Sequence, residues 1–180
     1  MYTIINAITK KKIMAVLKYR NATFDDLPKI VAIYNSTIAS RMVTADTEEV
    51  SVEDKLNWFY EHSTNFRPLW MIENNEDEVV GWVSFQSFYG RPAYNGTAEI
   101  SIYLDENFRG NGYGKQILEY SLQQAPTFGI KDVLAFIFAH NEPSVKLFQN
   151  FGFEVWGNFP NIAVLDDIER SLLILGKRIV

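Results

Sequence analysis

Residues 97–115 read TAEISIYLDENFRGNGYGK, and this stretch decides the fold of the chain. Its first eight residues alternate in polarity, which predicts a strand with two different faces. One face carries Ala98, Ile100 and Ile102, and the other carries Glu99, Ser101 and Tyr103. The glycine-rich residues 109–114 then predict a tight turn that opens a helix over 112–124.

Alternating and helical apolar patterns continue on both sides of this unit. The other expected strands are 17–20, 69–72, 79–85, 133–138, 153–156 and 169–175. The other expected helices begin after Thr23, at 51 and at Pro143, and the last one ends in a C-cap at Gly152. This order predicts the α/β (α+β) class, with a mixed, mostly antiparallel twisted sheet and helices on both faces. The strand at 133–138 is apolar on both faces, so we expect it near the centre of the sheet.

Length and composition limit the class of protein. The 180 residues suit one domain, which we expect at 18–180 behind an N-terminal extension at 1–17. The net charge of −5 gives no general attraction to nucleic acid, and no apolar run approaches the roughly 20 residues of a membrane span. There is no cysteine, and no His, Asp and Glu have the spacing of metal ligands. We expect a cytoplasmic protein with no metal, no nucleic acid and no membrane partner.

The turn at 109–114 has the chemistry of an anion site. Glycines let the backbone approach a ligand, and free N–H groups at the positive end of a helix bind phosphate oxygens. Arg109 and Lys115 add two cations. The alternative is an ordinary surface turn before a helix. A Walker loop is excluded because the Gly-Lys-Ser/Thr ending is absent, and a dinucleotide fingerprint is disfavoured because the turn lies deep in the chain, after a hairpin.

Two motifs in this order resemble the GNAT acetyltransferase superfamily. Residues 102–115 are similar to its Arg/Gln-x-x-Gly-x-Gly/Ala motif after a strand, and residues 141–153 are similar to its second segment, a helix with a trailing Gly-Phe. The resemblance implies a GNAT-like sheet and acetyl-CoA as cosubstrate. It implies that the pantetheine arm pairs with the backbone of Ile102, Tyr103 and Leu104. The pyrophosphate would lie on Arg109, Gly110, Asn111, Gly112, Tyr113 and Gly114, with Asn141 and Ser144 nearby. For Asn141 the alternative is a turn residue before Pro143.

Further segments are similar to the phosphinothricin acetyltransferase subfamily. They are residues 34–35, 58–59, 67–68, 81–85, 91, 94 and 97–103. Members of this subfamily acetylate the α-amine of phosphinothricin, methionine sulfone or methionine sulfoximine, and they are typically homodimers. The resemblance therefore implies an N-acetyltransferase that acts on the α-amine of a small amino acid or amino-acid analogue, and a homodimer.

Glu99 is the candidate catalytic base. Acetylation needs a neutral amine, so the ammonium group of an amino acid must first lose a proton. Burial within a central strand would raise the pKa of the Glu99 carboxyl toward a useful value. The alternative is a solvated polar strand face. The match to the Thr-x-Glu-x-Ser-x-Tyr pattern of the subfamily favours the role of catalytic base over that of a solvated surface residue.

The acceptor is expected near the start of the same strand. Arg91 and Tyr94 precede it, and a guanidinium suits a bidentate grip on a carboxylate, although a plain surface arginine is the alternative. Phe85, Gln86 and Ser87 end the preceding strand and are expected to line the same pocket.

Three positions depart from the pattern of the family. Phe148 stands where many members have a tyrosine acid, and it cannot donate a proton. Asp166 stands where the subfamily has a late histidine, and the aromatic substrate contact near Met42 is absent. The thiolate would then leave without a protein acid or take a proton from water. Acetylation of a protein N-terminus or a polyamine, and a non-catalytic CoA-binding regulatory domain, remain as alternative functions.

Overall fold

The computed structural model describes residues 16–180. The strands are β1 (Lys18–Asn21), β2 (Leu69–Glu73), β3 (Val79–Ser87), β4 (Thr97–Leu104), β5 (Asp132–Phe138), β6 (Glu154–Leu165) and β7 (Ile168–Arg178). The α-helices are α1 (Leu27–Ile38), α2 (Leu56–Tyr60), α3 (Tyr113–Gln124) and α4 (Glu142–Asn150). Strands and helices follow each other in the expected order. Nearly all of the expected extension at 1–17 lies outside the described residues.

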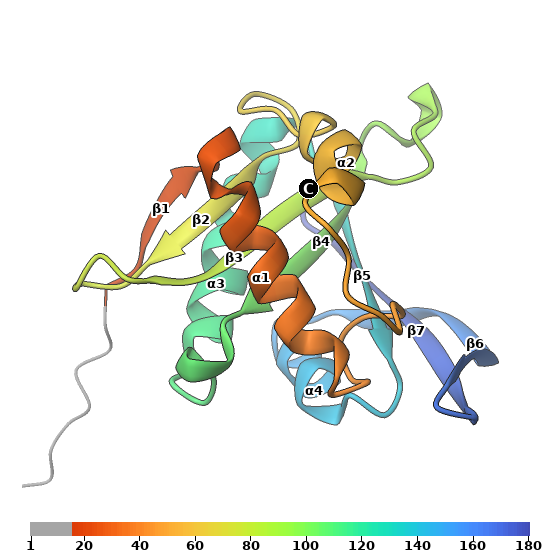
Figure 1. Cartoon of the computed structure of the whole chain (residues 1–180). Coiled ribbons are helices and arrows are strands. Elements are labelled where there is room, and N and C mark those ends of the chain that lie inside the picture. Colours follow the sequence, from red (N-terminus) through yellow and green to blue (C-terminus); the bar gives the residue numbers. More distant parts are fainter. Residues whose placement is uncertain (1–15) are drawn as a thin grey trace, which may run out of the picture.

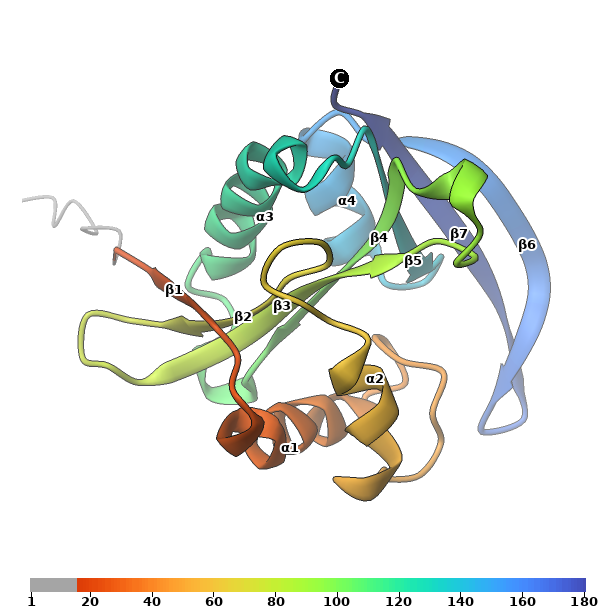
Figure 2. The same ribbon diagram turned by 90° about the horizontal axis from the view of Figure 1, so that it is seen from above.

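The strands form one seven-stranded sheet in the order β1-β2-β3-β4-β5-β7-β6. Only β4 and β5 pair in parallel, and all other neighbours are antiparallel. Helices α1 and α2 cover one face, while α3 and α4 cover the other (Figures 1 and 2). The predicted fold class is confirmed, and β5 lies inside the sheet as its apolar sequence indicated.

The alternation along β4 sends its side chains into two separate cores. Ala98 and Ile100 are buried in the larger core, which also holds Ile117 of α3 and Phe148 of α4. Tyr103 packs on the smaller core, which is built on α1. Glu99 lies on the same face of the strand as Tyr103, so the fold directs its carboxyl toward the side covered by α1 and α2.

The sheet opens between β4 and β5. The parallel ladder contains three pairs and ends at Glu99 opposite Leu134. Beyond this point β4 continues to pair only with β3, as far as Leu104, and β5 pairs only with β7. The facing edges of the two strands therefore keep backbone N–H and C=O groups without a ladder partner, and such groups can bind a ligand.

Local sequence signals account for the starts of the helices. Thr23 and Asp26 form a capping box before α1, where a helix start was expected, and Asn141 caps α4 by accepting a hydrogen bond from the Ser144 N–H at 3.3 Å. Helix α2 is shorter than the expected 51–62, because Ser51 and Asp54 first close a capped turn and residues 53–55 form a 3₁₀ turn. Strand β6 is much longer than the expected 153–156, since it pairs with β7 along nearly all its length.

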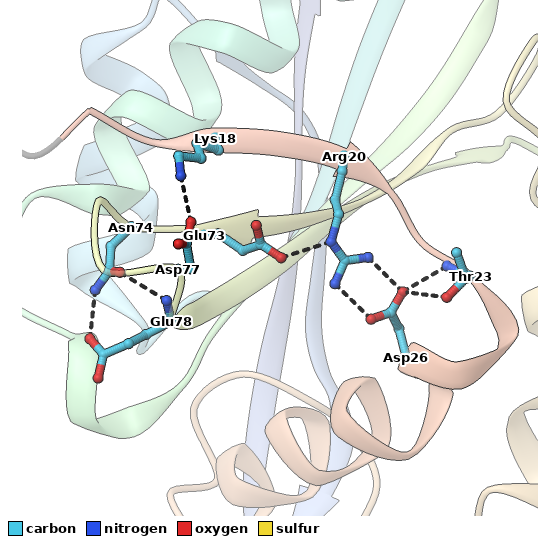
Figure 3. A network of polar contacts seen from close by, with 8 residues as sticks. All are labelled: Lys18, Arg20, Thr23, Asp26, Glu73, Asn74, Asp77 and Glu78. Atoms are coloured by element: carbon cyan, nitrogen blue, oxygen red, sulfur yellow. Dashed lines mark hydrogen bonds and ion pairs between the residues drawn. The ribbon is translucent and has the colours of Figure 1, made fainter.

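A network of ion pairs fixes the edge strand β1 to its neighbours (Figure 3). Arg20 donates from Nε to Glu73 of β2 at 2.7 Å, and from Nη1 and Nη2 to both carboxylate oxygens of Asp26, at 2.7 and 2.8 Å. Lys18 pairs with Asp77 in the β2–β3 turn. Hydrogen bonds from Arg20 lower the pKa of the Asp26 carboxyl from 3.8 to about 2. The fork geometry makes the Arg20–Asp26 pair the strongest of these contacts.

Two features of residues 16–180 bear on the class of protein. No helix in this part is long and apolar enough to cross a membrane. No three His, Cys, Asp or Glu side chains of this part gather as metal ligands would.

Candidate active site

The glycine turn leads directly into α3. Gly110 and Gly112 have φ values of 77° and 81°, which L side chains rarely adopt, so glycine is needed at both positions. Gly112 is the N-cap of α3, and no side chain caps this helix end. The first N–H groups of α3 therefore remain available to an anion. Arg109 is exposed beside them and donates from Nε to the Leu104 carbonyl at 3.3 Å.

A cavity of about 350 Å³ occupies the opening between β4 and β5, and we call it the wedge cavity. Its walls come from both strands, from the loop after α1, and from α3 and α4. The lining residues are Thr37, Ser40, Met42, Val43, Ile100, Ser101, Ile102, Tyr103, Leu104, Arg109, Gly114, Ala135, Phe136, Ile137, Asn141, Ser144, Leu147 and Phe148. The cavity thus runs from the glycine turn along the unpaired edge of β4. Among the predicted phosphate-turn residues, Arg109 and Gly114 reach its wall, while Gly110, Asn111, Gly112 and Tyr113 lie on the turn outside it.

Asn141 is buried where α4 begins. Its Oδ1 caps the helix, and its Nδ2 donates to the Met42 carbonyl at 3.0 Å. The capping residue also lines the wedge cavity beside Ser144. The bond to Met42 holds the loop after α1 against the cavity.

Two further contacts hold the same loop in place. His140 donates from Nε2 to the Arg41 carbonyl at 2.8 Å. The Arg41 guanidinium pairs with Asp166, whose side chain lies in the turn between β6 and β7. Asp166 is absent from the lining of the cavities described here, so its observed contact is with this loop.

A second cavity of about 200 Å³ lies between the sheet and the pair α1 and α2, and we call it the Glu99 cavity. It is lined by Ile30, Val31, Tyr34, Lys55, Trp58, Trp82, Gln86, Glu99, Ser101 and Tyr103. Ser101 and Tyr103 also line the wedge cavity, so the two cavities meet on β4. A group held in one cavity can therefore approach a group held in the other.

The Glu99 carboxyl has the environment of a proton acceptor. It is half-buried, and within residues 16–180 it takes part in no hydrogen bond or ion pair. Burial raises the pKa of Glu99 above its usual value near 4.5. A carboxyl with a raised pKa and no partner is suited to receive a proton from a ligand.

Aromatic side chains fix the walls around Glu99. The Tyr103 ring stacks on Trp82, with centroids 4.4 Å apart, and lies 5.1 Å from the Tyr34 ring. The Tyr34 hydroxyl donates to Asp46 at 2.5 Å, and burial raises the pKa of Tyr34 to about 12. These rings form a rigid, partly dry frame for the carboxyl.

The remaining predicted residues lie at different distances from this frame. Gln86 lines the Glu99 cavity, whereas Phe85 is fully buried in the other core and Ser87 does not reach the cavity, because alternation along β3 turns both to the opposite face. Arg91 and Tyr94 lie on the exposed β3–β4 loop and line neither cavity. Phe148 is buried against Phe153 and lines the wedge cavity without an acidic proton.

Several site residues were missed by the sequence analysis. The loop residues Ser40, Met42 and Val43, the β5 residues Ala135, Phe136 and Ile137, and the Glu99-cavity residues Tyr34, Lys55, Trp58 and Trp82 belong to this group. One signal could have found Lys55, because it stands one turn before Trp58 on a helix expected to pack by that face. The loop residues carry no comparable signal.

A comparison with protein families shows to which family the chain belongs. Residues 30–153 match the family model described as the acetyltransferase (GNAT) family. This chain belongs to that family. The match spans the Glu99 cavity, the wedge cavity and the glycine turn, and the GNAT protein is accordingly an acetyl-CoA-dependent N-acetyltransferase.

Named relatives and a solved structure agree with the family. The chain is 54% identical over 160 residues to "Putative phosphinothricin acetyltransferase YwnH" of Bacillus subtilis, covering 89% of this chain and 98% of the relative. It is 29% identical over 143 residues to the L-methionine sulfoximine/L-methionine sulfone acetyltransferase of Pseudomonas paraeruginosa, covering 79% and 83%. The crystal structure of a phosphinothricin acetyltransferase from Sinorhizobium meliloti in complex with acetyl-CoA shares the fold, with a TM-score of 0.84, 24% identity and coverage of 92% and 89%.

Proposed function

We propose that this enzyme transfers the acetyl group of acetyl-CoA to the α-amine of a small amino acid or amino-acid analogue, of the phosphinothricin or methionine sulfone type. The observation that carries the proposal is the meeting of two cavities at Ser101 and Tyr103, one beside the glycine turn and one containing Glu99. The wedge cavity takes the donor, and the Glu99 cavity takes the acceptor.

The walls of the wedge cavity fit acetyl-CoA. The backbone of Ile102, Tyr103 and Leu104 offers unpaired groups to the amides of the pantetheine arm. The glycine turn, with Arg109 and the uncapped start of α3, offers N–H groups and a cation to the pyrophosphate. Asn141 and Ser144 border the same cavity near the thioester end.

Glu99 is proposed to act on the acceptor as a general base. It takes a proton from the ammonium group of the amino acid, directly or through water, and the free amine attacks the thioester carbonyl carbon. The C–N bond forms, the nitrogen releases its second proton to water, the C–S bond breaks, and CoA leaves as a thiolate. Because Phe148 cannot supply a proton, the thiolate takes one from water. A thiol has a pKa of ~8.5, so the thiolate is an adequate leaving group without a protein acid.

The shape and charge of the Glu99 cavity support a small acceptor. Glu99 and Lys55 are the charged residues of its lining, so it lacks the several carboxylates that a polyamine would want. Relatives named for phosphinothricin and for methionine sulfoximine and sulfone point to the same class of amino-acid analogues. Arg91 and Tyr94 on the β3–β4 loop are proposed as further substrate contacts, together with Gln86, which lines the Glu99 cavity.

We also propose that the enzyme works as a homodimer in the cytoplasm. Strand β6 is an edge of the sheet, and it carries exposed apolar side chains, among them Trp156, Ile162 and Val164. An exposed apolar edge of this kind favours a protein partner. Light scattering after gel filtration should give the mass of two chains, and Trp156→Lys should shift the mass toward one.

The test of the function is an acetyl-CoA assay with a thiol-release readout. The panel is L-methionine sulfone, L-methionine sulfoximine, phosphinothricin, spermidine and a short unblocked peptide. We expect turnover of the amino-acid analogues, and a decrease in kcat/KM of about 10²–10⁴-fold for Glu99→Gln but not for the exposed Glu154→Gln. Turnover of spermidine or the peptide alone, or calorimetric binding of acetyl-CoA without any turnover, would overturn the proposal.

A further inference from the structure

The Glu99 cavity holds one cation as well as one carboxyl. Lys55 comes from the turn before α2, and Glu99 comes from β4 on the sheet below. The rest of the lining is aromatic or aliphatic, apart from Gln86 and Ser101. Two opposite charges on the walls of a small, mostly apolar cavity suggest a ligand that carries both charges itself.

Aromatic rings hold the Lys55 ammonium group. Its Nζ lies 4.2 Å from the centre of the Tyr34 ring and 5.9 Å from that of Trp58, so the rings hold the ammonium group in place. Among residues 16–180, it forms no ion pair with a carboxylate, unlike Lys18, Lys29 and Lys146. The carboxylate of the neighbouring Asp54 accepts hydrogen bonds from the N–H and hydroxyl of Ser51.

Lys55 and Arg91 differ in their access to the acceptor. Lys55 is half-buried and lines the cavity that contains Glu99, while Arg91 is exposed on the β3–β4 loop and lines neither cavity. An α-amino acid places its carboxylate two bonds from its amine nitrogen. When the amine lies at Glu99, the carboxylate therefore stays within this cavity, where Lys55 is the cation of the lining.

We propose that Lys55 binds the α-carboxylate of the acceptor and thereby selects free amino acids over amines that lack this group. The inference rests on the proposed function. Glu99 receives the ammonium group and Lys55 the carboxylate, so the zwitterion is fixed in one orientation with its nitrogen toward Ser101 and Tyr103. The rings of Tyr34 and Trp58 position the Lys55 ammonium before the substrate arrives, which lowers the entropy lost on binding.

The test compares two acceptors that differ only in the carboxyl group, L-methionine sulfone and its α-carboxamide. For the unmodified enzyme we expect a lower KM for the acid. Lys55→Met should raise the KM for the acid about tenfold or more and change kcat much less, because a charge-assisted hydrogen bond is lost. The KM for the carboxamide should change little, so the preference for the acid should disappear.

Three matched variants complete the test. Lys55→Arg should keep the preference for the acid, since the cation remains. Lys18→Met should behave as the unmodified enzyme, since Lys18 lies on β1 and lines neither cavity. Lys55→Gln, checked by circular dichroism, serves if Lys55→Met does not fold. Calorimetric titration of L-methionine sulfone into each variant with CoA bound reports the same preference without turnover.

The outcomes separate the two proposals. Suppose that the unmodified enzyme acetylates L-methionine sulfone. If Lys55→Met then raises the KM equally for both acceptors, or keeps the preference for the acid, the inference fails while the proposed function stands. If Arg91→Ala, rather than the Lys55 variants, abolishes the preference, the carboxylate binds Arg91 and the inference also fails. If the unmodified enzyme acetylates only amines without a carboxylate, both proposals are wrong.

Discussion

Arg41 Nε lies 2.9 Å from Asp166 Oδ2, and this ion pair joins the loop after α1 to the turn between β6 and β7. The two residues are 125 positions apart in the chain. Both have positive φ values, 53° and 51°, so the pair connects two tight turns. The same loop supplies Ser40, Met42 and Val43 to the wall of the wedge cavity. The β6–β7 turn therefore helps to position one wall of the wedge cavity.

We predict that Asp166→Ala weakens the binding of acetyl-CoA without stopping catalysis. Exposed ion pairs contribute modestly, so the KM for acetyl-CoA should rise about two- to fivefold while kcat changes little. Asp167→Ala is the matched control, because Asp167 is an adjacent aspartate with a positive φ and no ion pair within residues 16–180. Steady-state kinetics at low salt measures the effect. An equal change in the KM for acetyl-CoA in both variants would show that the Arg41–Asp166 pair does not position the loop.

The raised pKa of Glu99 has a consequence for stability. Burial raises the pKa of its carboxyl in the folded chain, whereas the unfolded chain ionises near 4.5. As the pH rises above 4.5 the unfolded state releases this proton first, so the folded state loses stability until the pH passes the raised pKa. Ionised Glu99 thus lowers the stability of the fold above that pH.

We predict that Glu99→Gln is more stable than the unmodified protein at pH 8 and equal to it near pH 4. Glutamine has nearly the same shape and does not ionise, so the variant escapes the cost of the buried charge. Urea unfolding at both pH values measures the difference. The exposed Glu154→Gln should show none of this pH dependence. A stability gain of the same size at pH 4 would mean that ionisation of Glu99 is not its cause.

The sequence predicted the elements of the fold well, because their signals are local. Residues 97–104 alternate strictly, and the capping box of Thr23 and Asp26 or the left-handed Gly112 marks a helix start within a few residues. The length of β6 was underestimated, since the pairing of an exposed edge strand depends on β7 rather than on its own pattern.

Part of the candidate site could also be predicted from local sequence signals. Glu99 and the glycine turn were found because motif and alternation coincide there. The wedge between β4 and β5 was implied only by the family resemblance, through the pairing of the pantetheine arm with residues 102–104. The residues themselves do not predict it, since the point at which two strands stop pairing depends on packing across the whole sheet. Lys55 and Arg41 were missed for a related reason: each acquires its role from residues distant in the chain, Glu99 and Asp166 respectively.

Gly81 packs closely against β4 beside the wedge cavity, which Tyr103 lines. A Cβ added to it would lie 2.4 Å from the carbonyl oxygen of Tyr103 on β4. Because that contact is with backbone, it can be relieved only by moving the strand. We predict that Gly81→Ala lowers the free energy of unfolding by about 1–3 kcal/mol and raises the KM for acetyl-CoA.

Gly96→Ala is the control for this prediction. A Cβ there would meet only the Lys131 side chain, at 3.6 Å, which is ordinary contact. Urea denaturation of both variants gives the comparison. A Gly81→Ala protein as stable as Gly96→Ala would mean that β3 and β4 separate freely at this point, contrary to the packing described.

The Arg20–Asp26 pair should make the fold sensitive to acid. Asp26 has a pKa of about 2 in the folded chain, against 3.8 as its ordinary value, because Arg20 donates two hydrogen bonds to it. The stability that this pair contributes is therefore complete above pH 3.8 and is lost as the pH falls toward 2. The Asp26 side chain is only 14% exposed, but that of Arg20 is 40% exposed, so solvent screens part of the interaction.

We predict that Asp26→Asn lowers the free energy of unfolding at pH 7 by an amount on the order of 1–2 kcal/mol. Between pH 4 and pH 2 the stability of the unmodified protein should decrease toward that of the variant, because protonation removes the same charge. Urea unfolding across this range measures both. Asp25→Asn, at the exposed neighbouring position, should follow the unmodified protein throughout. If the gap between Asp26→Asn and the unmodified protein stayed constant down to pH 2, the loss would come from packing or capping rather than from the charge that Arg20 holds.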